Sequence, residues 1–511
     1  MQESLKRADR GTAVVFVRSR LTLIALFLLT ILSVSASRAQ DKPGVLRPPI
    51  ESQPISITIS INEAVETANR RYPSIARSDM DTKLAGHEIT VAKTQYLPRM
   101  DMLLQEMRAT QNVTAGTILP QFLNVIPLQS GPPVGGSSFS SLFNSNAGLN
   151  FSWELVDFGK RAANVKLARR GFDQSQATLT LTRLDVQTRA ADTYLKLIMA
   201  KRQILAFQAT LERMKEWALV VHTLCDKGLR PGVDAFRADA EVSLSKIALI
   251  DANKEADLLQ QDLAESIGMA GSNVTTVEGP LVTRPKQNLP SPQVLLMPGA
   301  GKDDLSKHPL ALVRSAQIDV SKARLHLLDR SWYPHLWLES GIWGRGSGDR
   351  RVASPVADGI LPRTANWAVG LTVQFPIMDY FKIRAQKGVE RSQIQARQAE
   401  YDLAMQELIK QDGKARVYLA RAQEVAAETP VLVEAARENE IKARERYRVG
   451  LTNVVEVAEA ERILARAQVE DAVSQVKVWQ AILSTAYAHG DLQPFLRLVS
   501  LSEQTGPGGK P

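Results

Sequence analysis

The stretch that decides the fold is WELVDF at Trp153–Phe158, because FPIMDY at Phe375–Tyr380 repeats it later in the chain. The aspartates of the two stretches, at 157 and 379, are 222 residues apart, and Gly228 and Gly450 are separated by the same distance. An offset shared over such a length indicates that the chain is an internal duplication.

Two proline landmarks extend the duplication toward the N-terminus. Tyr72-Pro73 and His308-Pro309 are 236 residues apart, so the first copy holds 14 extra residues between its landmarks. The Gly/Ser/Pro-rich segment Gln129–Ser141 lies in that interval. It is therefore expected to be a variable, exposed loop.

Each copy is predicted to run helix, two strands, very long helix, turn, helix. The first helix opens at Ser60 with a Ser-x-x-Glu capping box and is expected to continue to about Gln95, before Pro98. The very long helices are expected over Lys160–Cys225 and Lys382–Tyr447, each 66 residues. At 1.5 Å per residue each would extend about 99 Å, which indicates a long, coiled-coil-like assembly.

Strand-like alternation follows the first helix of each copy. Apolar residues alternate with small or polar ones over 147–155 and again over 367–375, and partner strands are expected near 99–108 and 335–344. Such alternation is typical of a barrel strand with lipid on one side and water on the other. It also suits a strand on a soluble core, so the pattern alone leaves both interpretations open.

Four strands per chain are too few to enclose a lumen, and exposed strand edges are not tolerated in lipid. Closure of a barrel would therefore need several copies of the chain, in a number that the strands do not determine. The predicted fold class is α+β, internally duplicated, with four barrel strands and long α-helical hairpins in each chain.

Residues 1–39 have the pattern of a secretory signal peptide. A basic segment precedes the apolar run Leu21–Val34, and cleavage is predicted after Ala39, with Ala36 as the alternative. The 14 apolar residues would span about 21 Å, less than a hydrocarbon core of about 30 Å. No run of 18 apolar residues follows residue 40, so the exported chain is expected in the periplasm, the medium or an outer-membrane barrel.

The predicted organisation follows from these features. It is a signal peptide at 1–39, a Pro-rich extension at 40–59, repeat 1 at 60–272, a Pro-rich linker at 273–302, repeat 2 at 303–492 and a C-terminal tail at 493–511.

Composition argues against several classes of function. The chain has 511 residues and a formal charge of +9, but both signs are interspersed behind an export signal, so nucleic acid is not an expected partner. Cys225 is the single cysteine, and the six histidines form no His-x-x-x-His pair. No metal site, cofactor or enzymatic activity is therefore predicted.

The doubled pattern resembles the TolC-type outer-membrane efflux protein family, the outer-membrane factors. The resemblance covers residues 60–490 and is carried by Asn62–Val65, the Tyr-Pro and His-Pro landmarks, Trp153–Arg161 and Arg448–Thr452. It implies a homotrimer whose outer-membrane β-barrel continues into a periplasmic α-helical barrel, with 273–302 at the equator. The implied partners are outer-membrane lipid, a periplasmic adaptor (membrane fusion) protein and an inner-membrane transporter of RND, ABC or MFS type.

The function implied by the resemblance is the exit channel of a tripartite efflux or type I secretion system. The cargo is expected to be chosen mainly by the inner-membrane transporter. The alternative function is a periplasmic coiled-coil adaptor or scaffold without a membrane barrel. The aromatic strand face and the lack of a lipoyl-like all-β segment argue against that alternative.

The resemblance also implies a periplasmic constriction lined by acidic residues. The matching positions here are Glu456 and Glu459, with Asp234 as the counterpart of Glu456 in the first copy. Three copies would surround the opening with carboxylates, which favour cations. The structural alternative makes Asn453 a helix N-cap, Glu456 its capping-box partner and Glu459 an acid favoured by the helix dipole.

Two further site predictions concern the turns between the long helices. The resemblance implies a closed-state contact between Tyr447 and Asp234, but Thr452 stands where the family has an arginine, so a hydrogen bond is the expected contact. Apolar residues beside the turn glycines are expected to dock the adaptor. The predicted docking residues are Gly228, Leu229, Val449, Gly450, Leu451 and Thr452.

Overall fold

The computed structural model describes residues 56–110, 141–282, 305–347 and 359–504, all within the compact unit that follows Pro54. The predicted signal peptide at 1–39, the extension up to residue 55, the loop at 129–140 and the linker from 283 to 302 lie outside the described residues.

The order helix, two strands, long helix, turn, helix occurs twice. The first copy consists of α2 (Ile61–Arg71), α3 (Pro73–Thr94), β2 (Arg99–Thr110), β3 (Ser141–Val156), α4 (Lys160–Asp226) and α5 (Gly232–Ser266). The second consists of α8 (Pro309–Arg330), β5 (His335–Ser347), β6 (Thr364–Gln374), α9 (Asp379–Arg448) and α10 (Val454–Ala488). The predicted α+β, internally duplicated fold with four strands and long helical hairpins is confirmed.

The first helix is not continuous, so the expectation of one helix from Ser60 to Gln95 was wrong. Tyr72 adopts an extended conformation, with φ −67° and ψ 126°, and Pro73 starts α3. A proline ring clashes with a helical residue before it, which explains the break. The capping box at Ser60 and Glu63 is formed as the sequence indicates.

Four short elements within the described residues were not predicted. They are β1 (Ser56–Ile59), β4 (Asn273–Thr276), the 3-10 helix η1 (Gly279–Val282) and α11 (Gln493–Gln504). β1 and β4 pair in parallel, so the end of the predicted extension and the start of the predicted linker lie together.

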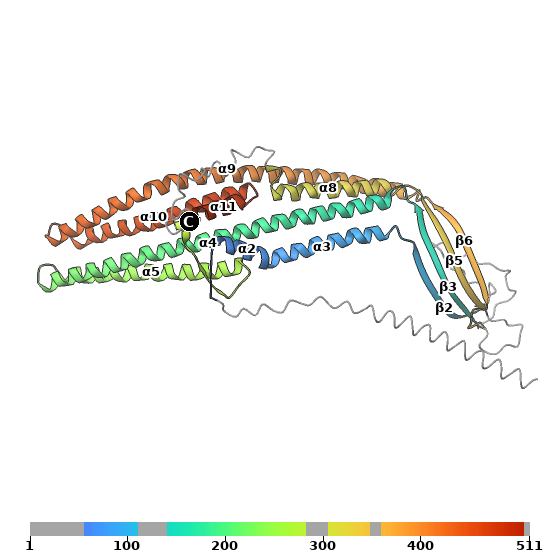
Figure 1. Ribbon diagram of the computed structural model, residues 1–511, viewed down its shortest axis with the longest axis horizontal. Helices are drawn as coiled ribbons and strands as arrows, with labels where there is room; N and C mark the ends of the chain where they lie inside the picture. Colours follow the sequence, from blue (N-terminus) through green and yellow to red (C-terminus); the bar gives the residue numbers. More distant parts are fainter. Residues whose placement is uncertain (1–55, 111–140, 283–304, 348–358, 505–511) are drawn as a thin grey trace, which may run out of the picture. The chain divides into compact units, whose positions relative to one another are not determined.

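The long helices pack side by side (Figure 1). Near the sheet the lateral order is α3, α4, α8, α9, and toward the helical turns it is α5, α4, α10, α9. Helix α4 therefore lies inside both layers, together with α8 near the sheet and with α10 toward the turns, whereas α3, α5 and α9 lie at the edges.

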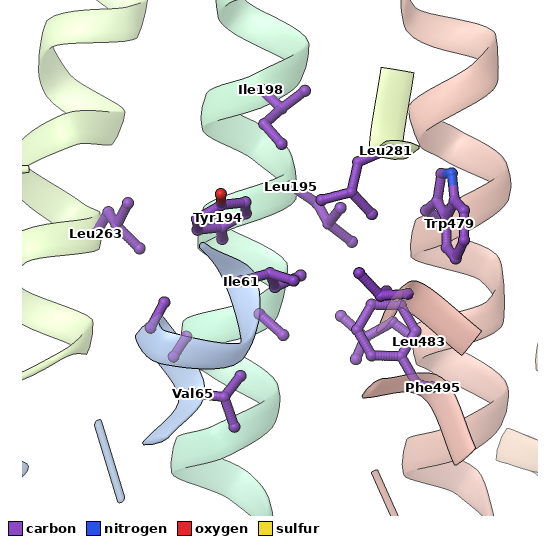
Figure 2. Close-up of a cluster of buried hydrophobic side chains, with 14 of the residues drawn as sticks. Ile61, Val65, Tyr194, Leu195, Ile198, Leu263, Leu281, Trp479, Leu483 and Phe495 are labelled. Carbon is purple, nitrogen blue, oxygen red and sulfur yellow. The ribbon is translucent and has the colours of Figure 1, made fainter. Parts of the chain in front are cut away.

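The principal core lies where the middle of α4 meets α2, α5, α10 and α11 (Figure 2). The Tyr194 hydroxyl lies 3.0 Å from the Ile59 carbonyl and 2.7 Å from the Val277 carbonyl, which ties the short sheet to α4. Trp479 of α10 and Phe495 of α11 are fully buried against one another, with ring centroids 6.4 Å apart. This core joins both repeats into one unit.

The strands β2, β3, β5 and β6 form one antiparallel sheet in that order. Its register places one apolar residue from each strand in a row across the sheet: Met102, Leu149, Ile342 and Trp367. These four are between 49% and 76% exposed.

The neighbouring row across the sheet points to the opposite face, because side chains alternate along each strand. This row consists of Asp101, Asn150, Gly341 and Ala368. Over these two rows the sheet has exposed apolar side chains on one face and small or polar side chains on the other, although Leu103 and Trp343 also lie on the second face.

Candidate functional site

The two turns between the long helices have the same backbone geometry. Gly228 and Gly450 have φ of +70° and +83°, a conformation that glycine adopts without strain. In each turn the amide after the glycine donates to a carbonyl five residues back, at 2.9 Å. This is the Schellman arrangement that ends many helices, and it reverses both hairpins in the same way.

The predicted partners Tyr447 and Asp234 lie in contact across the two hairpins. The Tyr447 hydroxyl donates to Asp234 Oδ2 at 3.1 Å, and both side chains are buried. Trp217 of α4 packs edge-on against the Tyr447 ring, with centroids 4.8 Å apart. Burial, and then the charge of Asp234, raises the pKa of Tyr447, so the hydroxyl keeps the proton that it donates.

Arg230 completes this contact and was missed by the sequence reasoning. Its guanidinium carbon lies 4.2 Å from the centre of the Tyr447 ring, and the group also donates to the Tyr447 carbonyl. Arg230 and Thr452 occupy matched positions, 222 residues apart. The first turn therefore supplies the arginine that the second lacks, and the repeat offset was the signal that could have identified it.

Glu456 and Glu459, the predicted constriction acids, are both exposed and both paired with arginine. Glu456 Oε1 lies 2.8 Å from Arg446 Nη1, and Glu459 Oε2 lies 3.6 Å from Arg462 Nη1. Asn453 is the N-cap of α10 and accepts from the Glu456 amide at 3.0 Å. The Glu456 carboxylate accepts from Arg446 and from the Thr452 hydroxyl.

Asp234 differs from these two acids in its surroundings. It is only 7% exposed, whereas the side chains of Glu456 and Glu459 are 46% and 62% exposed. Within one chain, the first-copy acid thus lies beneath Tyr447 and the second-copy acids lie at the surface.

Apolar side chains are exposed around both turns, including the predicted docking residues Leu229, Val449 and Leu451, each at least 66% exposed. Thr452 is half-buried. The sequence reasoning missed the neighbouring Phe236, which is 76% exposed. Exposure there depends on which face of α5 is turned to α4, and the sequence of one short segment carries no clear signal of it.

In residues 56–110, 141–282, 305–347 and 359–504, no group of three His, Cys, Asp or Glu side chains is arranged to hold a metal ion. Over the same ranges, the helices are either too short or too polar to cross a membrane.

Comparison with known proteins gives a consistent family. A family model described as outer membrane efflux protein matches residues 64–269 and 305–484. The cobalt-zinc-cadmium resistance protein CzcC of Cupriavidus metallidurans is 22% identical over 235 residues, 46% of this chain and 50% of that protein. The chain thus matches about half the length of this curated relative.

Solved structures show the same fold. One of them is CusC, whose crystal structures concern the conformational changes that accompany folding and transmembrane channel formation. The similarity has a TM-score of 0.70 at 15% identity and covers 84% of this chain and 92% of CusC. The CmeC outer membrane channel of Campylobacter jejuni has a TM-score of 0.66 and 15% identity, covering 88% and 90%.

Proposed function

Because the chain belongs to the outer membrane efflux protein family, we propose that its copies form the outer-membrane exit channel of a tripartite efflux or type I secretion system. The observation that carries this proposal is the exposed apolar row across the four-stranded sheet. The family match supports the channel over the alternative of a periplasmic coiled-coil scaffold.

The sheet supplies the membrane part of the proposed channel. Among the described strands, β2 and β6 each pair on one side only, and the three antiparallel pairings make them run in opposite directions. The β6 edge of one copy can therefore pair antiparallel with the β2 edge of the next. Three copies would give about twelve strands, enough to enclose a lumen and leave no edge in lipid.

The helices supply the periplasmic part. The edge helix α5 exposes Leu244, Ile247 and Ile250, and the edge helix α9 exposes Val431 in the layer toward the turns, all by more than half. Joining α5 of one copy to α9 of the next would remove this apolar surface from water. In a homotrimer, the same contact between neighbouring copies would be repeated three times. It would close the strands into a barrel and the helices into a cylinder.

The helical turns supply the gate and the docking surface. The Tyr447–Asp234 hydrogen bond and Arg230 join the two hairpins of one chain and act as the closed-state contact. The exposed Leu229 and Leu451 dock a periplasmic adaptor, which links the channel to an inner-membrane transporter of RND, ABC or MFS type. Glu456 and Glu459 form the cation ring, and their arginine partners reduce its net charge.

Membrane flotation of cells that express the full chain tests this proposal. We expect the protein to float with outer-membrane markers and to cross-link to the mass of three chains. Val369→Lys places a charge on the apolar face, at a cost of about 2–4 kcal/mol in mid-bilayer, and should reduce the floating fraction. Ala368→Lys, on the opposite face of β6, is the matched control. Release of the unaltered protein into the soluble fraction would refute the proposal.

A further inference from the structure

A second group of charges lies inside the helices behind the turns. Glu440 and Glu461 are only 5% and 1% exposed, and two arginines, Arg213 and Arg444, lie against their carboxyl groups. We call these four residues the buried joint. The arginine side chains are only partly buried, at 22% and 19% exposed. Ionisable groups in such surroundings are costly unless they are paired, so the joint is held together by contacts among its own members.

The joint connects the two hairpins. Arg213 comes from α4 in the first hairpin, and its Nε lies 3.4 Å from Glu461 Oε2 of α10 in the second. Arg444 of α9 contacts both Glu440 and Glu461. Arg213 also donates to Gln468 of α10 at 2.9 Å. Separation of the hairpins would therefore expose or unpair these charges.

Charged side chains lie near Glu440 on two neighbouring helices and on its own helix. Glu461 faces it from α10, Arg213 from α4, and Arg444 from its own helix. One layer further out, Arg462 pairs with Glu459 and with Glu241 of α5.

A continuous stack links the joint to the Tyr447 contact. The guanidinium carbon of Arg444 lies 5.7 Å from the centre of the Trp217 ring, and Trp217 packs against Tyr447. Arg230 covers the Tyr447 ring at 4.2 Å. Movement of Arg444 would thus be transmitted through two aromatic rings to the turn.

Glu440 is the proton-binding member of the joint. Burial, followed by its hydrogen bond to Glu461, raises the pKa of Glu440 to about 7 from an ordinary value of 4.5. Protonated Glu440 donates that hydrogen bond, whereas two ionised carboxylates repel each other in a poorly solvated site. Because the pKa is raised in the packed arrangement, the stabilisation is complete below pH 4.5 and is lost as the pH rises through about 7.

We infer that the buried joint positions the two turns and loosens when Glu440 loses its proton, so that acidic pH favours the closed turns and alkaline pH favours their separation. The inference rests on the proposed function in taking the turns as the gate. Over the whole titration, from well below pH 4.5 to well above pH 7, loss of the proton lowers the ratio of closed to separated turns by at most about 300-fold.

The distance between the two turns of one chain tests the inference. The substitutions Leu229→Cys and Val449→Cys, in a Cys225→Ser background, provide one spin-label site in each turn. Labelled chains are diluted with unlabelled ones in detergent, so that the measured distance is the one within a single chain. Electron paramagnetic resonance between pH 5 and 8 should show a growing separated fraction. Glu440→Gln, which mimics the protonated acid, should hold the short distance at every pH. Glu438→Gln, an exposed acid on the same helix, should keep the original pH profile.

A label distance that does not change with pH in the chain with native Glu440 would overturn the inference. An unaltered pH profile in Glu440→Gln would overturn it as well. If Glu440→Gln fails to fold by circular dichroism, Glu440→Asp replaces it and must move the midpoint of the profile. The distance measurement needs no membrane, so failure to float with the outer membrane would refute the proposed function while leaving this result intact.

Discussion

Replacing Tyr447 with phenylalanine removes one oxygen atom from the contact between the hairpins. The ring that packs on Trp217 and lies under Arg230 is kept, so the variant isolates the hydrogen bond to Asp234. The Asp234 carboxylate would remain buried without this donor.

The magnitude follows from the charge and burial of the acceptor. A hydrogen bond to a charged group contributes about 1.5–3 kcal/mol, and a buried group left without its partner bears the cost of its desolvation. The free energy of separating the turns should fall by that amount. At about 1.4 kcal/mol for each factor of ten, the separated population should rise roughly 10- to 150-fold.

Hydrogen–deuterium exchange at the two turns measures this population. Amide exchange there should accelerate by the same roughly 10- to 150-fold in Tyr447→Phe, because local opening exposes the amides. Exchange in the core around Trp479 should not change. Tyr418→Phe, on the exposed side of α9, serves as the matched control. Unchanged exchange at the turns would refute the reasoning that this hydrogen bond holds the hairpins together.

Four further variants test other contacts. Arg230→Ala removes the cation from the Tyr447 face, worth about 0.5–2 kcal/mol, and should raise exchange at the turns roughly 2- to 30-fold. Glu456→Ala with Glu459→Ala should raise single-channel conductance and weaken block by multivalent cations, because the carboxylates at the opening are lost. Gly490→Ala should lower the melting temperature strongly, since its Cβ would lie 2.6 Å from a proline carbon at φ +78°. Gly450→Ala, with φ +83° and a Cβ at the ordinary contact distance of 4.0 Å from Arg230 Nη2, should cost only about 1–2 kcal/mol.

Each of these has its own contradicting outcome. For Arg230, the control is Arg237→Ala on the exposed side of α5. Equal amide exchange at the turns in both variants would show that the Arg230 cation does not stabilise the closed turns. For the acidic pair, unchanged currents in the double variant would exclude a lumenal ring. For the glycines, equal melting temperatures would show that the close approach at residue 490 relaxes freely.

Features repeated within the chain were predictable from the sequence. The 222-residue offset locates both turns, and the period-two pattern locates β3 and β6, because each depends on local residue order. The contact of Tyr447 with Asp234 was expected from the family resemblance, since both residues flank matched turns.

Features that depend on partners distant in the sequence were not predictable in this way. The β1 segment alternates Ile57 with polar residues, but its pairing partner lies more than 200 residues further on. Arg213 and Glu461 are 248 residues apart and look like ordinary charges on two amphipathic helices. Only the packing of α4 on α10 shows that Arg213 pairs with the buried Glu461.

Single-channel recording tests the central claim most directly. Purified full chain, folded by circular dichroism and added to a planar lipid bilayer, should produce discrete and uniform current steps as assembled channels insert. A folded preparation that stays monomeric in water without detergent and gives no current steps would contradict the account.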